Sequence, residues 1–175
     1  MSELTFNDYL FDLCFSDEKG LILFNGAHKN KKYTKRDCFH YMGCDTEEYA
    51  EMLQLTATFQ LCRKTKFTID FYKEHIKFAE DSRILTDLPN QCGLENYDGF
   101  LDHRHDQSIL SILQKKHNVK IIEDISQLPG AIFCSINSFK QGCLLIKFTT
   151  ANRIVDALEI LKNDTASTNV QMANF

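Results

Sequence analysis

The stretch Asp98-Gly-Phe-Leu-Asp-His-Arg-His-Asp-Gln-Ser-Ile-Leu-Ser-Ile-Leu113 joins a run of ionisable side chains to the apolar face of a predicted helix. The apolar residues of its second half follow the i, i+1, i+3, i+4 spacing of a buried helix: Ile109, Leu110, Ile112 and Leu113. Asp106 stands where an N-cap residue would stand. The pattern therefore predicts a buried helix with a polar cluster at its positively polarised N-terminus.

The polar cluster at residues 102–107 has two interpretations. Its side chains are of the types that hold a phosphate, a metal ion or sugar hydroxyls, and a helix N-terminus attracts anions. Charged residues are also common in loops that lead into helices. The residue types alone are equally consistent with a binding site and with a polar loop that caps a helix.

Three runs of the sequence resemble, in the same order, segments of bacterial and viral glycosyltransferases that build lipopolysaccharide or capsule chains. They are residues 33–42 (YTKRDCFHYM), residues 54–64 (QLTATFQLCRK) and residues 102–113 (DHRHDQSILSIL). The resemblance covers roughly residues 6–122. It implies a GT-A-like fold and a protein that transfers a sugar from a nucleotide-sugar donor to a glycan acceptor.

The resemblance also implies roles for individual residues. Asp106 and His105 are the expected catalytic residues, with Asp106 as a candidate base for the acceptor hydroxyl. Seven further residues are expected to bind substrate: His103, Arg104, Gln107, His28, Lys35, Asp37 and Tyr97. His103 and His105 lie two positions apart, on one side of an extended segment, and are the candidate ligands of Mn²⁺ or Mg²⁺. The hypothesis predicts that Asp106 and His105 line one pocket with the loop around His28.

Three of these residues also have structural interpretations. Asp37 completes a capping box with Thr34, which favours a helix start over catalysis. Tyr97 is either a flat platform for a sugar ring or an anchor that ties its loop to the core. His28 belongs to a basic loop that either contacts phosphates or is simply solvated.

The family's metal-binding motif is missing from these 175 residues. Related enzymes carry an Asp-x-Asp motif after an N-terminal nucleotide-binding half, and this sequence contains no Asp-x-Asp. We therefore expect an α/β fold with a partial GT-A-like mixed sheet flanked by helices, lacking that half. Four interpretations stay open: a truncated enzyme, a partner chain that supplies the missing half, a non-catalytic remnant or binding domain of the same fold, and an unrelated small α/β interaction domain.

Periodicity predicts further elements on both sides of the opening stretch. Helices are expected at residues 5–15, 38–42, 66–80 and 151–162, and strands at residues 21–24, 55–62, 118–122, 131–136 and 143–148. Asn25-Gly26 is a turn signal, and Pro, Gly and Asn predict a loop at residues 87–102. We expect one domain at residues 1–163, divergent from residue 123 onward, and a disordered tail at residues 164–175.

Composition narrows the class of protein. With 43% hydrophobic and 25% charged residues, the chain is typical of globular domains. Its net charge of −4 and scattered lysines argue against nucleic-acid binding. The seven cysteines are irregularly spaced and include no Cys-x-x-Cys, which argues against a zinc or thioredoxin motif. Because no signal peptide is recognisable either, we expect reduced thiols in a cytoplasmic protein. No apolar run approaches the ~18 residues of a membrane span, and no signal peptide is recognisable. Peripheral contact with the inner face of a membrane stays open.

Overall fold

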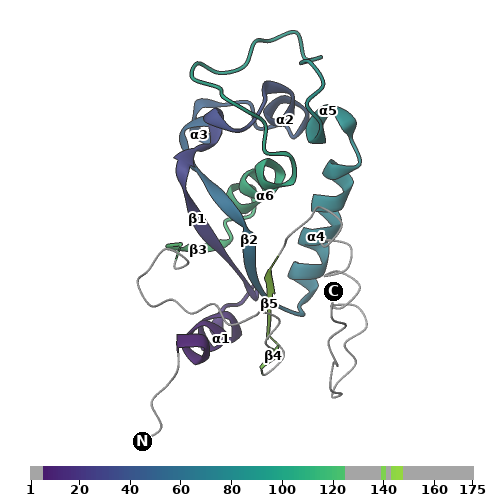
Figure 1. The fold of residues 1–175 in the computed structure, drawn as a ribbon. Helices are drawn as coiled ribbons and strands as arrows, with labels where there is room; N and C mark the ends of the chain where they lie inside the picture. Colours follow the sequence, from purple (N-terminus) through teal and green to yellow (C-terminus); the bar gives the residue numbers. More distant parts are fainter. Residues whose placement is uncertain (1–5, 125–138, 141–142, 148–175) are drawn as a thin grey trace, which may run out of the picture.

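The computed structural model describes residues 6–124, 139–140 and 143–147. This part of the chain is a mixed α/β fold, in which a mixed sheet is flanked by helices (Figure 1). The expected α/β class and helix-flanked mixed sheet are confirmed. The expected strand at residues 131–136, helix at residues 151–162 and tail at residues 164–175 lie outside the described residues, as does most of the divergent region that begins at residue 123.

The sheet has the strand order β3-β1-β2-β5-β4 among the described residues. Its strands are β1 (Leu21–Lys29), β2 (Leu53–Arg63), β3 (Lys120–Ile122), β4 (Phe139–Lys140) and β5 (Cys143–Lys147). Strand β1 pairs antiparallel with β2 and parallel with β3, and β5 pairs antiparallel with both β2 and β4. Strands that were expected at residues 21–24, 55–62, 118–122 and 143–148 are therefore present, whereas β4 lies in a stretch that was expected to be loop.

The expected turn at Asn25-Gly26 is wrong, because both residues lie inside β1. Asn25 pairs with Leu55 of β2. A Cβ atom on Gly26 would lie 2.4 Å from the backbone oxygen of Gln54. This glycine therefore permits a close approach of two strands rather than a reversal of the chain.

Both faces of the sheet are covered. Leu21 and Leu23 of β1 belong to one buried cluster, and the alternate residues Ile22 and Phe24 belong to another. Helix α1 (Phe6–Ser16) packs on the second cluster. Helices α4 (Lys66–Ala79) and α6 (His105–Lys116) pack on the first.

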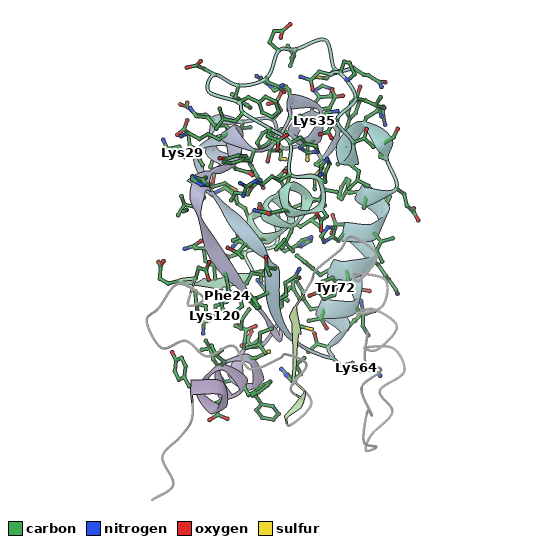
Figure 2. The ribbon with its side chains drawn as sticks, in the orientation of Figure 1. Phe24, Lys29, Lys35, Lys64, Tyr72 and Lys120 are labelled. Carbon is green, nitrogen blue, oxygen red and sulfur yellow. The ribbon has the colours of Figure 1, made fainter. Side chains whose placement is uncertain are left out.

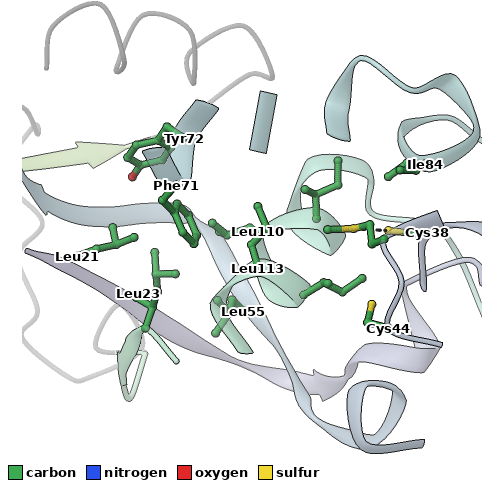
Figure 3. Packing of buried hydrophobic residues seen from close by; sticks show 14 of the residues in the cluster. Leu21, Leu23, Cys38, Cys44, Leu55, Phe71, Tyr72, Ile84, Leu110 and Leu113 are labelled. Atoms are coloured by element: carbon green, nitrogen blue, oxygen red, sulfur yellow. Dashed lines mark hydrogen bonds between the residues drawn. The ribbon is translucent and has the colours of Figure 1, made fainter. Parts of the chain in front are cut away.

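Helix α6 is the most buried helix of the described part. Its side chains Leu110 and Leu113 lie in one cluster with Leu23, Leu55 and Phe71 (Figure 3). The helix expected at residues 66–80 is confirmed as α4, and it begins with a capping box. The apolar spacing that predicted both helices therefore corresponds to faces that are buried.

Short helices gather at one end of the sheet, next to a long irregular segment at residues 86–104. They are η1 (Asn30–Lys32), α2 (Arg36–Tyr41), α3 (Glu47–Glu51) and α5 (Ser82–Leu85). Helix α5 is too short for periodicity to reveal, and it was not expected. The irregular segment, called the long loop below, arches over α2 and the start of α6 at the top of Figure 1.

Candidate functional site

Helix α6 begins two residues earlier than expected, at His105 and not at Gln107. Arg104 is the N-cap residue and makes no side-chain cap, so the prediction that Asp106 caps the helix is wrong. His105 has a φ of 39°, in the left-handed region that residues with a Cβ seldom adopt. The polar run therefore enters the helix through a strained residue, a feature that is frequent at functional sites.

His103 is a buried imidazole with both ring nitrogens engaged. Its Nδ1 accepts the backbone N–H of Lys35 at 3.3 Å, and its Nε2 donates to the carbonyl of Ile84 at 2.8 Å. Burial lowers the pKa of His103 to about 4, so the ring is neutral at pH 7. This side chain ties the start of α6 to α2 and α5.

The two candidate metal ligands do lie together. The ring centroids of His103 and His105 are 5.2 Å apart, and Nε2 of His105 lies 3.1 Å from the carboxylate of Asp87. However, a metal bound to His103 would have to replace one of its two hydrogen bonds. Among residues 6–124 and the two short strands, no three His, Cys, Asp or Glu side chains are grouped to hold a metal ion. His103 and His105 are therefore not arranged as a free pair of metal ligands.

Lys35 and Asp37 hold the long loop in place, and we call this pair the latch. The Lys35 ammonium donates to the carbonyls of Thr86 at 3.1 Å and Leu88 at 2.6 Å. The Asp37 carboxylate accepts the backbone N–H groups of residues 91 and 92 at 2.8–2.9 Å. Both side chains are buried, and their charged atoms are 3.7 Å apart. Lys35 is labelled beneath the loop in Figure 2.

The charge state of the latch follows from these contacts. Burial alone would raise the pKa of Asp37, but the two amide groups from the loop and the Lys35 ammonium outweigh it, and the pKa lies below its ordinary value. Asp37 is therefore an anion that binds the backbone of the loop. Its carboxylate is fully occupied by this structural role.

The expected capping box at Thr34 and Asp37 is wrong. The Thr34 hydroxyl donates to the side-chain oxygen of Asn30 at 2.8 Å instead. The first N–H groups of α2 donate to the long loop, from Arg36 to Asn96 at 2.7 Å and from Asp37 to Asn90 at 3.3 Å. Distant asparagines thus satisfy the free N–H groups that a local cap would satisfy.

Tyr97 anchors the long loop to α2. Its hydroxyl donates to Asp45 at 2.7 Å, and the Arg36 guanidinium lies 3.9 Å from its ring centroid. Phe39 meets the ring at 88° with centroids 5.5 Å apart. Burial and the hydrogen bond to Asp45 raise the pKa of Tyr97 to about 12. These contacts favour the anchor interpretation over a sugar platform.

His28 and Arg104 both lie close to the ring of Tyr33. The Arg104 guanidinium lies 3.9 Å from the ring centroid of Tyr33, and the His28 ring lies 5.1 Å from the same ring. His28 belongs to the end of β1 and not to a loop. The structure thus brings the basic segment next to the histidine run, with Arg104 stacked on an aromatic face.

Gln107 takes part in a polar junction that joins the three runs noted in the sequence. It donates to the side-chain oxygen of Gln54 at 3.2 Å, and Gln54 donates to the carbonyl of Tyr33 at 3.2 Å and to Ser108 at 3.3 Å. Ser108 also donates to the Tyr33 carbonyl at 2.8 Å. Sequence reasoning missed Gln54 and Ser108, although a serine on the buried face of an apolar helix was a signal that its hydroxyl has a partner.

Asp106 lies half-buried next to a buried histidine of α4. Burial raises the pKa of Asp106 above its ordinary value. His75 is 1% exposed, and neither of its ring nitrogens has a hydrogen-bond partner among the described residues. Burial lowers its pKa to about 4, an effect that the backbone of Asp106 partly offsets. The environment of α4 and α6 thus disfavours charge on both side chains.

A cleft of about 240 Å³ lies within the long loop, where residues 87–90 approach residues 96–103 and Lys35, the residue before α2. Lys35 and His103 are its buried lining residues, and Asp87, Phe100 and Asp102 are among the more exposed ones. His28, His105 and Asp106 do not line this cleft. Of the predicted site residues, only Lys35 and His103 line this cleft, so it is not the shared pocket that was expected for Asp106, His105 and the segment around His28.

Comparison of the chain with protein-family models, with curated proteins and with solved structures found no match. In the part of the chain that the structure describes, none of the helices has the length and apolar character needed to cross a membrane.

Proposed function

We propose that this chain is the acceptor-side part of a GT-A-like glycosyltransferase, which transfers a sugar from a nucleotide-sugar donor to a surface polysaccharide or related glycan. In this proposal another chain or segment supplies the nucleotide-binding half, and the site works at the inner face of a membrane, where glycan acceptors are assembled.

One observation carries the proposal. The three runs that resemble such enzymes are far apart in the sequence, yet they meet in one hydrogen-bonded junction through Gln54, Tyr33 and Ser108. A fourth contact joins the first and third runs, from the Lys35 N–H to His103. Segments that serve one site must come together in the fold, and these segments do.

The chemistry assigned to Asp106 agrees with its surroundings. A base that takes a proton from an acceptor hydroxyl works best when its pKa is raised towards the working pH. Asp106 has a raised pKa because it is half-buried, and it follows the strained residue His105 at the start of α6. His105 is paired with Asp87 and would orient the acceptor rather than take its proton.

A second candidate function is sugar binding without sugar transfer. It is favoured because the basic groups of Lys35 and Arg104 already have partners within the protein. The Lys35 ammonium is bound by two carbonyls and lies near Asp37, and Arg104 is stacked on Tyr33. A leaving diphosphate needs a metal ion or free basic groups to neutralise it. The described residues do not group to supply the metal, so transfer would need the missing half.

The test is to measure binding and transfer with UDP- and GDP-sugars, for the chain alone and with added candidate partner chains. We expect the active combination to lose at least about 100-fold in rate when Asp106→Asn removes the base. Asp98→Asn, an exposed loop aspartate, is the matched control and should leave the rate unchanged. Equal rates for the Asp106→Asn and Asp98→Asn variants would overturn the role of Asp106.

A further inference from the structure

The cleft in the long loop has a volume suited to a small ligand. Its volume of about 240 Å³ lies below the roughly 300–1,000 Å³ of sites for drug-sized molecules. A whole nucleotide sugar exceeds this space, whereas a single sugar ring does not. The cleft is therefore suited to a part of the substrate other than the nucleotide.

Two carboxylates of the cleft lining can accept hydrogen bonds from a ligand. One carboxylate oxygen of Asp102 accepts the backbone N–H of His103 at 2.9 Å. The other oxygen has no hydrogen-bond partner among the described residues. Asp87 adds a second carboxylate, which is shared with His105. Carboxylates only accept hydrogen bonds at neutral pH, so the ligand must bring its own donors. Hydroxyl groups do this, and fully ionised phosphates do not.

Charges of both signs at the cleft disfavour a charged ligand. An anion would meet the carboxylates of Asp87 and Asp102, and a cation would approach the Lys35 ammonium. His103 is neutral at pH 7 and compensates neither charge. An uncharged polyol avoids both conflicts.

Apolar side chains complete the site. Phe100 and Pro89 line the cleft, and Leu88 and Leu101 line it while remaining 48% and 66% exposed. Such surfaces pack against the C–H face of a pyranose ring and are dehydrated when the ring binds. The latch already holds residues 86–92 in place, so little loop ordering is needed on binding.

We infer that this cleft binds one uncharged sugar ring of the glycan acceptor, through the Asp87 and Asp102 carboxylates and the Phe100 side chain. The inference rests on the proposed function, and it identifies one ring of the acceptor as a neutral sugar and not a phosphorylated or amino sugar; since Asp106 does not line the cleft, this ring is not the one whose hydroxyl reacts.

The experiment titrates the ¹⁵N-labelled full chain with methyl glycosides of glucose, galactose, mannose and N-acetylglucosamine, and with glucose 1-phosphate and glucosamine as charged probes. We expect saturable shifts at amides of residues 87–103 for at least one methyl glycoside, with affinity about tenfold higher than for either charged probe. Phe100→Ala and Asp102→Asn should each weaken binding about tenfold. Leu94→Ala is the matched control, since Leu94 is an exposed apolar residue of the same loop that does not line the cleft.

Three results would overturn the inference: no methyl glycoside binds, a charged probe binds more tightly, or both variants bind as the unmodified chain does. Should Phe100→Ala fail to fold, Asp102→Asn decides, because its remaining oxygen still accepts the His103 N–H. Nucleotide-sugar transfer is measured separately. Transfer without glycoside binding at the cleft overturns only this inference, and glycoside binding without transfer overturns only the proposed reaction.

Discussion

The sheet side and the loop side of the molecule are held together by different kinds of contact. On the sheet side, α6 packs apolar residues such as Leu110 and Leu113 into a continuous buried cluster. On the loop side, residues 86–104 contain no helix or strand and depend on Lys35, Asp37 and Tyr97. Apolar packing tolerates small shifts, whereas hydrogen bonds from buried charges require a fixed geometry. The loop side is therefore ordered by few residues, of which the buried charges Lys35 and Asp37 should have the largest effect.

The largest expected effect comes from breaking the latch. Asp37→Ala removes the hydrogen bonds to residues 91 and 92 and leaves the Lys35 ammonium buried beside no anion. We expect the free energy of unfolding to fall by about 3–5 kcal/mol. Denaturant titration measures this, and hydrogen exchange should show the amides of residues 91 and 92 losing protection first. Asp98→Ala, an exposed loop position, should change stability by less than about 0.5 kcal/mol.

A core truncation tests the sheet side. Leu113→Ala in α6 leaves a cavity next to Leu55 and Phe71, and it should cost about 3 kcal/mol in the free energy of unfolding. Unlike Asp37→Ala, it should leave the relative protection of the loop amides unchanged, because none of the latch contacts involves Leu113. If Leu113→Ala selectively lowered the hydrogen-exchange protection of the loop amides, the stability of the loop would depend on the packing of α6, and the two sides of the molecule would not be independent.

His75 offers a change that should stabilise the protein. Its buried ring nitrogens have no partner among the described residues, so His75→Phe exchanges an unsatisfied polar ring for an apolar one. We expect a gain of about 1–2 kcal/mol at pH 7, measured by denaturant titration. A loss of stability would mean that the imidazole makes a stabilising contact, for which the backbone of Asp106 is the candidate.

The same variant should alter the pH dependence of stability. The folded-state pKa of His75 is about 4, below its ordinary value, so the unfolded chain binds the proton first as the pH falls. Stability should therefore fall between about pH 6.5 and pH 4, by on the order of 3 kcal/mol from this residue. His103 contributes in the same direction and Asp106 in the opposite one. His75→Phe should flatten the profile, and an unchanged slope would contradict the assignment.

The smallest effect is expected at the far end of the loop. Tyr97→Phe removes the hydroxyl that donates to Asp45 but keeps the ring beneath Arg36. The free energy of unfolding should fall by about 0.5–1.5 kcal/mol. Because the ring contacts are retained, hydrogen exchange at residues 91 and 92 should stay as in the unmodified chain; a larger effect there would make Tyr97 part of the latch.

Much of the fold could be predicted from the sequence. Apolar spacing at residues 66–80 and 109–113 predicted α4 and α6, the apolar run at residues 21–24 predicted β1, and rough alternation at residues 55–62 predicted β2. The helices bury one stripe, which periodicity reveals, and β1 is buried on both faces at Leu21–Phe24, which a continuous apolar run reveals. The turn signal at Asn25-Gly26 failed because a glycine that permits close strand approach has the same local sequence as a glycine in a turn.

The sequence identified several residues of the site, but it did not predict how they are arranged. The run at residues 102–107 was identified, and His103 and His105 do lie together. The sequence did not reveal that Asp37 binds the backbone 54 positions away, or that Asn90 and Asn96 cap α2. Such contacts depend on how distant segments meet, and no local pattern encodes them. A buried lysine and a surface lysine also look alike in a sequence.

The most direct test of the carbohydrate site is a crystal structure of the full chain grown with the methyl glycoside that binds best in the titration. We predict one sugar ring in the cleft, with hydroxyl groups on Asp102 and Asp87 and a C–H face against Phe100. An unoccupied cleft with the sugar bound elsewhere, or with no sugar bound at saturating concentration, would contradict the account.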